Sequence, residues 1–246
     1  MYKNYIFDLY GTLVDIRTDE SRESLWEGMA ELYRNEGAAY GTEELKRAYL
    51  LLCKEEEERI RQENGCEHPE IEIGEVFRKL YARKSVRVGE EAVTYAAGRF
   101  REWSREYMRV YDGAIEMLEE LRRMGRRVFL LSNAQRLFTA SEIEVLGLGK
   151  FFDDIFISSD YGVKKPEQAY MELLLKKHHL EIRDCIMIGN ELGSDIEIAN
   201  VCGMDSLLLQ GNMPERSEKG TAATYVAAEG DLGYIRFIYD WKAGGK

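Results

Sequence analysis

The sequence lacks the marks of several common protein classes. Its longest uninterrupted apolar stretches, such as residues 48–53 and 128–131, are far shorter than the ~20 residues that a membrane span needs. Its four cysteines form no Cys-x-x-Cys pair, which argues against a structural zinc site and a disulfide framework. Acidic side chains outnumber basic ones by 45 to 34, and an anionic surface repels phosphate backbones. We therefore expect a protein that binds neither membranes nor nucleic acid.

The composition suits a folded protein with more than one hydrophobic core. Of the 246 residues, 45% are apolar and 32% are charged, as in ordinary globular proteins. The length exceeds what one core usually organises, so we expect two domains or one domain with a large insert. Residues 1–7 lead straight into polar sequence, without the pattern of a secretory leader. These features predict a cytoplasmic protein, a monomer or homodimer, whose partner is a small molecule.

Strand and helix patterns alternate along much of the chain. Residues 112–124 carry Ile115, Leu118 and Leu121 at helical spacing, with Asp112 placed to cap the helix and Gly125 to end it. Four short apolar runs, bounded by polar or glycine residues, read as buried strands: residues 5–7, 128–131, 155–157 and 186–188. Strands that alternate with helices imply a parallel sheet covered on both faces, which is an α/β fold.

One long segment differs in texture from the rest. Residues 16–109 are rich in charge, contain few strand signals and show helix-like apolar spacing, for example at Leu25, Met29 and Leu32. We interpret this segment as a helical insert between the first strand and the remainder of the sheet. The predicted division is therefore a core of residues 1–15 and 110–246 and a helical domain of residues 16–109.

A polar cluster follows each of the four predicted strands. Ligands of open parallel sheets bind beyond the carboxyl ends of the strands, so these clusters are expected to meet in one place. In chain order they are residues 8–12 (Asp-Leu-Tyr-Gly-Thr), 132–133 (Ser-Asn), 164–166 (Lys-Lys-Pro) and 189–195 (Gly-Asn-Glu-Leu-Gly-Ser-Asp). Their order and their positions at strand ends indicate a single functional site.

The residue types in these clusters suit the transfer of an anionic group. A carboxylate on a tight turn, Asp8, can attack an electrophilic phosphorus or carbon and form a covalent intermediate. Lys165 can keep that carboxylate ionised and neutralise an anionic substrate. The Ser132 hydroxyl and the N–H groups of a glycine turn can bind phosphoryl oxygens. Asp195 can complete an oxygen site for Mg²⁺.

The four clusters resemble the motifs of the haloacid dehalogenase (HAD) superfamily, in the branch with an α-helical cap inserted after the first motif. The resemblance covers residues 1–15 and roughly 110–212, and for the insert it extends only to position and helical character. It implies a Rossmann-like parallel-sheet core with an inserted α-helical cap domain, with Asp8 as nucleophile and Lys165 beside it. Ser132 would hold the charged group of the substrate, and we assign Asn133, Gly11 and Thr12 to the same task.

Two positions depart from the pattern of the family's phosphatases. Those enzymes carry an acid/base aspartate two residues after the nucleophile, where this chain has Tyr10, as the 2-haloacid dehalogenases do. The fourth motif keeps the Gly-x₅-Asp frame of the metal-using members, but its first acidic position is Asn190. A Mg²⁺ ligand at Tyr10 would be the backbone carbonyl, which is indifferent to the side chain. Either Asn190 or Glu191 would add an oxygen beside Asp8 and Asp195.

Three functions are compatible with this sequence. The leading hypothesis is a Mg²⁺-dependent phosphatase of a small metabolite, in which protons come from the Tyr10 hydroxyl, a cap residue or water. Such an enzyme is expected to favour acyl and aryl phosphates, because general acid–base help is worth about 10²–10⁴-fold for poorer leaving groups. The alternatives are a 2-haloacid dehalogenase, suggested by Tyr10, and a catalytically weak protein that binds a phosphorylated ligand.

Overall fold

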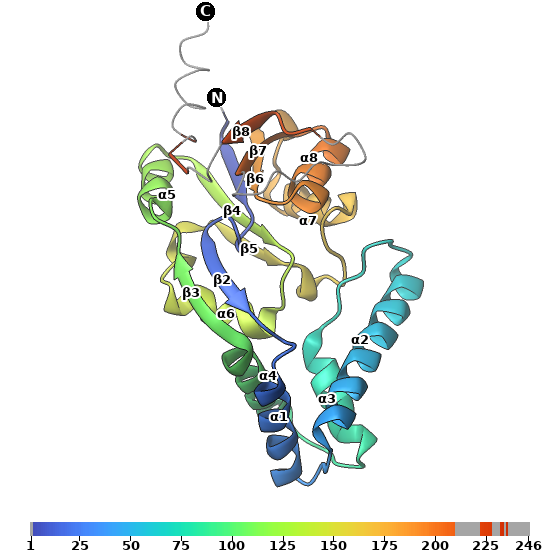
Figure 1. Cartoon of the computed structure of the whole chain (residues 1–246). Helices are drawn as coiled ribbons and strands as arrows, with labels where there is room; N and C mark the ends of the chain where they lie inside the picture. Colours follow the sequence, from blue (N-terminus) through green and yellow to red (C-terminus); the bar gives the residue numbers. More distant parts are fainter. Residues whose placement is uncertain (1, 210–221, 228–231, 234, 236–246) are drawn as a thin grey trace, which may run out of the picture.

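A six-stranded parallel sheet forms the centre of the computed structural model, which describes residues 2–209, 222–227, 232, 233 and 235 (Figure 1). The strand order is β5-β4-β1-β6-β7-β8, and every neighbouring pair is parallel. The strands are β1 (Asn4–Phe7), β4 (Arg127–Ser132), β5 (Asp154–Ile157), β6 (Cys185–Gly189), β7 (Asp205–Leu209) and β8 (Tyr225–Ala227). The four predicted strands are confirmed as β1, β4, β5 and β6, and all but β5 are almost wholly buried.

Helices cover both faces of this sheet, as the alternating pattern predicted. Side chains of successive strand residues point to opposite faces, so Phe7 packs in a cluster with residues of α5 and α6, whereas Ile6 packs with residues of α7 and α8. The α-helices are α5 (Ala114–Arg123), α6 (Arg136–Val145), α7 (Gln168–His178) and α8 (Glu197–Cys202). Short turns of other helix types lie at Gly149–Phe151, Ser158–Asp160, Ile182–Asp184 and Leu192–Ile196. The α/β fold class is thereby confirmed.

The start of α5 differs from the prediction in one detail. The residue before the helix is Gly113, in a left-handed conformation with φ of +81°, and no side chain of the described residues caps the helix there. Asp112 therefore does not act as the N-cap, because glycine adopts the positive φ of this turn at little cost and moves the helix start one residue on. Gly125 does follow the end of the helix, also with a positive φ.

Residues 14–110 form a ribbon that leads to four helices and back (Figure 1). The ribbon pairs β2 (Val14–Thr18) with β3 (Arg105–Val110) in antiparallel fashion. The helices are α1 (Glu23–Asn35), α2 (Thr42–Asn64), α3 (Ile73–Arg83) and α4 (Glu90–Ser104). They bury a hydrophobic cluster of their own, in which the rings of Tyr49, Phe77 and Phe100 lie 5.2–5.9 Å apart and Phe138 of α6 also takes part.

The sequence patterns did not predict this ribbon, nor β7 and β8. The segment Arg105–Val110 mixes three charged residues with Tyr107, Met108 and Val110 and has no buried residue, so it carries no buried-strand signal. None of the helices in the described ranges is long and apolar enough to cross a bilayer. The division of the chain into a core and a cap domain stays a prediction.

Candidate active site

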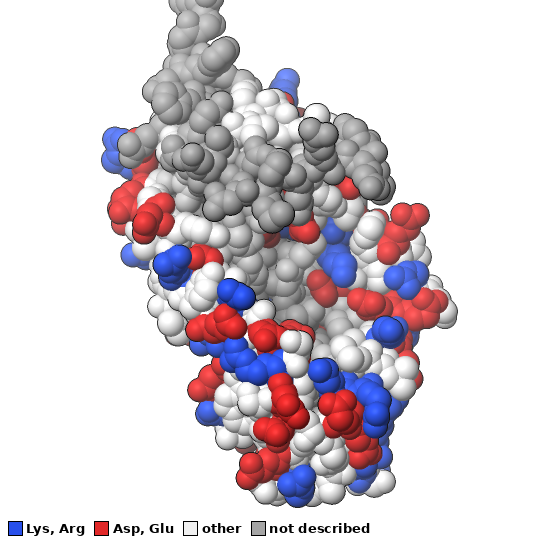
Figure 2. All heavy atoms as spheres, in the orientation of Figure 1, with Lys and Arg blue, Asp and Glu red and all other residues white. Residues whose placement is uncertain are grey.

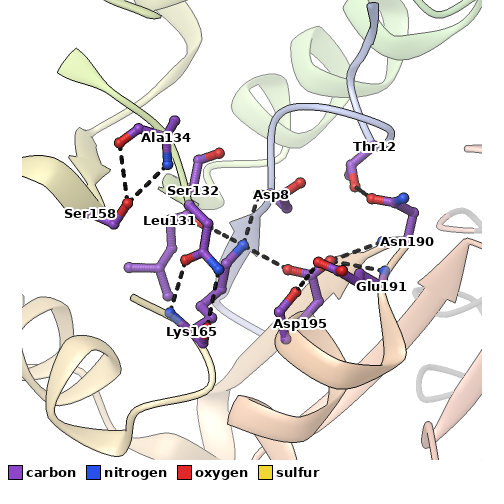
Figure 3. A network of polar contacts seen from close by, with 12 residues as sticks. Asp8, Thr12, Leu131, Ser132, Ala134, Ser158, Lys165, Asn190, Glu191 and Asp195 are labelled. Carbon is purple, nitrogen blue, oxygen red and sulfur yellow. Dashed lines mark hydrogen bonds and ion pairs between the residues drawn. The ribbon is translucent and has the colours of Figure 1, made fainter. Parts of the chain in front are cut away.

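Lys165 lies between two carboxylates at the carboxyl ends of the parallel strands. Its Nζ donates to Asp8 Oδ1 at 2.7 Å and to Asp195 Oδ1 at 2.6 Å, and also to the carbonyl of Leu131 at 2.8 Å (Figure 3). Lys165 is 3%, Asp8 7% and Asp195 1% exposed. Residues 157 positions apart in the sequence thus form one buried ion cluster, at the edge of the sheet where ligands of such folds bind.

Protonation in this cluster is set by burial and by mutual attraction. Burial lowers the pKa of Lys165, but Asp195 and Asp8 outweigh it, so the net pKa is raised and the ammonium stays charged. Burial raises the pKa of Asp195 to about 6, against the opposing effect of Lys165. Two carboxylates therefore share one cation, and a single proton or cation added to the site would balance its charge.

The loop after β4 fixes the position of Lys165. The Asn133 side chain accepts from the Lys165 backbone N–H at 2.8 Å and donates to its carbonyl at 3.1 Å. Among the described residues, the hydroxyl of Ser132 is a buried group without a hydrogen-bond partner. An unsatisfied buried hydroxyl is costly, and it is therefore a natural donor for an anionic substrate oxygen.

The loop after β6 holds Asp195 from the other side. Asp195 Oδ2 accepts the backbone N–H groups of Asn190 and Glu191, each at 3.1 Å. A Cβ at Gly189 would lie 2.2 Å from the Asp195 carboxyl, so only glycine fits there. Ser194 Oγ donates to the Glu191 carboxylate at 2.6 Å. The side chains of Glu191 and Ser194 thus bind each other within the loop.

Asn190, in contrast, lies against the turn that follows Asp8. Its amide oxygen accepts from Thr12 Oγ1 at 3.2 Å (Figure 3). Gly11 has a φ of +78°, and a Cβ there would come within 2.5–2.8 Å of the Asn190 amide. The turn with Gly11 and Thr12 and the loop with Asn190 therefore pack directly on each other. This contact places Asn190, rather than Glu191, against the turn that follows Asp8.

The hydroxyl of Tyr10 points to α6. It donates to the Glu142 carboxylate and lies 3.0 Å from Thr139 Oγ1. Glu142 also accepts from Arg101 of α4 at 2.8 Å and from Arg105 at 3.2 Å, and Arg101 stacks over the Tyr10 ring. Burial and the neighbouring Glu142 raise the pKa of Tyr10, so its hydroxyl stays protonated at neutral pH.

This cluster of Tyr10, Glu142 and Arg101 was not predicted from the sequence. Its signal was present in the spacing, because Phe138, Glu142 and Ile143 fall on the buried face of α6, where a glutamate needs a cationic partner. The sequence of α4 alone does not reveal that the partner is Arg101, which is 41 residues away.

The oxygen donors at this site suit Mg²⁺, although they contain few carboxylates. Within the described residues, Oδ1 of Asp8 accepts a hydrogen bond and Oδ2 accepts none. The Asn190 amide oxygen lies against the turn that follows Asp8. No group of three or more His, Cys, Asp or Glu residues that could hold a metal is found in the described ranges. Proteins usually bind Mg²⁺ through one or two carboxylates, with waters and substrate phosphate completing the shell, so this donor set fits that ion.

Comparisons with known proteins agree with the geometry. Residues 2–203 match the family model of haloacid dehalogenase-like hydrolases. The ribulose-1,5-bisphosphate 5-phosphatase of Halopiger xanaduensis is 29% identical over 124 residues, which are 50% of this chain and 51% of that protein. The chain spans about half the length of the curated relatives that it matches first.

Solved structures show the same fold. The 2-haloacid dehalogenase of Pseudomonas syringae pv. Tomato aligns with a TM-score of 0.66 and 18% identity, over 98% of this chain and 100% of the other. The magnesium-bound HAD-hydrolase YfnB of Bacillus subtilis aligns with a TM-score of 0.57 and 20% identity, over 96% and 98% of the two chains. At these identities the likeness concerns the fold alone.

Replacing Lys165 with methionine is expected to destabilise the protein strongly. The change leaves two buried carboxylates facing each other without a cation, and breaking a buried ion pair in this way costs about 3–5 kcal/mol. Urea denaturation measures the loss. The matched control is Lys164→Met, one residue away and outside the cluster, for which the free energy of unfolding should change by less than about 1 kcal/mol. Equal free energies of unfolding of the two variants would contradict the claim that Lys165 neutralises the two buried carboxylates.

Proposed function

Because the chain belongs to the haloacid dehalogenase-like hydrolase family, we propose that it is a Mg²⁺-dependent phosphatase of a small phosphorylated metabolite. One observation carries the proposal: Asp8, after β1, binds a buried ammonium through one oxygen, and the neighbouring strand β4 ends in a buried hydroxyl, Ser132 Oγ, that has no partner among the described residues. A nucleophile, a cation and a hydrogen-bond donor are what the transfer of a phosphoryl group requires. The similarity to sugar-phosphate phosphatases supports the choice of substrate class.

The proposed reaction begins at the free oxygen of Asp8. This oxygen attacks phosphorus, the bond to the ester oxygen breaks, and the leaving group departs with the electron pair. Lys165 neutralises charge on the nucleophile and on the transferred group, while Ser132 donates to a phosphoryl oxygen. Water then opens the aspartyl-phosphate, which releases phosphate and regenerates Asp8.

We propose that Asp8, the backbone carbonyl of Tyr10 and the amide oxygen of Asn190 hold the metal. When bound, Mg²⁺ shields negative charge on the nucleophile and the substrate. Glu191 and Asp195 remain further predicted ligands. The Glu191 carboxylate already accepts from Ser194, and the Asp195 carboxylate accepts from Lys165 and from two backbone N–H groups.

A dehalogenase acting on a short 2-halo acid is the second candidate. Tyr10 occupies the position at which those enzymes carry tyrosine. Asp195, a predicted metal ligand, already binds Lys165. Halide leaves without a proton, so this reaction needs no acid near the nucleophile. Halide release that persists in EDTA would favour this candidate, whereas phosphate release that depends on Mg²⁺ supports the phosphatase. A protein that only binds a phosphorylated ligand would show phosphate affinity without either release.

Replacing Asp8 with asparagine is expected to abolish turnover. An amide oxygen is a poor nucleophile, so phosphate release from a panel of small phosphate esters should fall to the level without enzyme, with and without Mg²⁺. Circular dichroism and thermal melting check that the variant is folded. Remaining turnover in folded Asp8→Asn protein would rule out Asp8 as the nucleophile.

The leaving group is expected to decide the rate. The Tyr10 hydroxyl donates to Glu142 and so does not protonate the leaving group, and acyl and aryl phosphates should react about 10²–10⁴-fold faster than alkyl phosphates, which is the range of acid–base help. Tyr10→Asp would place a carboxylic acid near the leaving group and should narrow that ratio. Rates of phosphate release for matched aryl and alkyl esters measure the effect. Equal turnover of both classes by the unmodified protein would refute the expectation.

Asn190→Asp is expected to strengthen Mg²⁺ binding. The change adds a carboxylate without altering shape, and Thr12 can still donate to it. We expect the Mg²⁺ concentration for half-maximal binding to fall by about tenfold, because affinity rises with the number of charged ligands. Calorimetric titration with Mg²⁺ gives the affinity without an activity assay. The isosteric control Glu191→Gln should change the affinity for Mg²⁺ by a smaller factor than Asn190→Asp does. A larger change in Glu191→Gln would make Glu191 the ligand.

A further inference from the structure

The segment between α2 and α3, residues 65–72, lies against the loop that carries Lys165. Pro69 forms an antiparallel bridge with Val163, and the backbone of Glu70 donates to the carbonyl of Gly162 at 3.2 Å. In return the Lys164 N–H donates to the carbonyl of His68 at 3.2 Å. The two segments therefore pair through one antiparallel bridge and two flanking backbone hydrogen bonds, although about 95 residues separate them in the sequence.

Glu70 extends these contacts to two further loops. Glu70 is 9% exposed, and its two carboxylate oxygens accept from Ser158 Oγ at 2.7 Å and from Gln135 Nε2 at 2.9 Å. Gln135 also donates to the carbonyl of Ile71 and accepts from the N–H of Ile73, both at 2.9 Å. Burying a carboxylate is costly, and here the hydrogen bonds of two core loops offset that cost.

These core loops hold the residues of the candidate active site. Ser158 Oγ accepts from the backbone N–H of Ala134 at 2.9 Å (Figure 3). The same hydroxyl donates to Glu70. Ala134 directly follows Asn133, whose side chain brackets the backbone of Lys165. Glu70 is thus linked through Ser158 to the short stretch that carries Ser132 and orients Lys165.

We propose that Glu70 is a positioning residue: from the helical insert, it holds the loops of Ser132 and Lys165 in the geometry that phosphoryl transfer needs. This inference rests on the proposed phosphatase function. A displacement of about 1 Å at a reacting group can cost 10²-fold in rate, so a residue that fixes two such loops can control kcat without touching the substrate.

The test compares Glu70→Ala and Glu70→Gln with a matched control on the same segment. Glu70→Ala removes both acceptors, and kcat for an aryl phosphate should fall by about 10–100-fold with a smaller change in KM. Glu70→Gln can still bridge Gln135 and Ser158, because an amide both accepts and donates, so it should restore most of kcat. Glu72→Ala is the control: Glu72 accepts from Gly74 and Glu75 at the start of α3, so its loss should lower the melting temperature and leave kcat unchanged.

A double variant and a measurement without substrate complete the test. Ser158→Ala should lower kcat as Glu70→Ala does, and the two changes together should cost no more than either alone, because both break one connection. Hydrogen exchange should be faster at residues 133–136 and 163–166 in Glu70→Ala than in Glu72→Ala. Unchanged kcat and unchanged exchange in folded Glu70→Ala would overturn the inference. Absence of phosphate release by the unmodified protein would instead overturn the proposed function, and the exchange data would still decide whether Glu70 fixes these loops.

Discussion

The burial of one ammonium between two carboxylates constrains the rest of this structure. Lys165 can keep its charge there only because Asp8 and Asp195 approach it from the ends of β1 and β6, and those strands are neighbours in the sheet. The strand order therefore brings the two carboxylates close enough to neutralise one buried ammonium. Each surrounding loop contributes to the same end, since Asn133 holds the backbone of Lys165 and two backbone N–H groups hold Asp195. The face shown in Figure 2 carries exposed acidic and basic side chains close together, whereas Asp8, Lys165 and Asp195 are buried.

Part of this arrangement could be predicted from the sequence, and the reason lies in the kind of strand. Buried parallel strands are continuous apolar runs, so β1, β4, β5 and β6 were recognisable, and the polar residues after them had to meet at one edge. The ribbon strand β3 has no buried residue and mixes charged with apolar residues, so it gave no such signal. The meeting of Asp8, Lys165 and Asp195 was predictable; the exact donor set for a metal was not, because it depends on how Asn190 packs against Gly11.

The residues that were missed share one property: their partners are remote in the sequence. Glu70 binds Ser158, 88 residues later, and Glu142 binds Arg101, 41 residues earlier. Nothing local distinguishes Glu70 from the many exposed glutamates of the same segment, because a side chain's burial is set by the tertiary structure. Glu142 differs, since it interrupts the apolar face of α6 and could have been recognised as a buried charge in need of a partner.

The pairing of residues 68–70 with residues 162–164 has a consequence for the way such proteins diversify. A helical insert that merely sat above a catalytic sheet could be exchanged for another, with new specificity and the old chemistry. Here the insert supplies backbone and side-chain contacts to the loop that bears the ammonium, so the two parts have to change together. A chimaera that carries a foreign insert would keep Asp8, Lys165 and Asp195 but lose these contacts to the loop of Lys165.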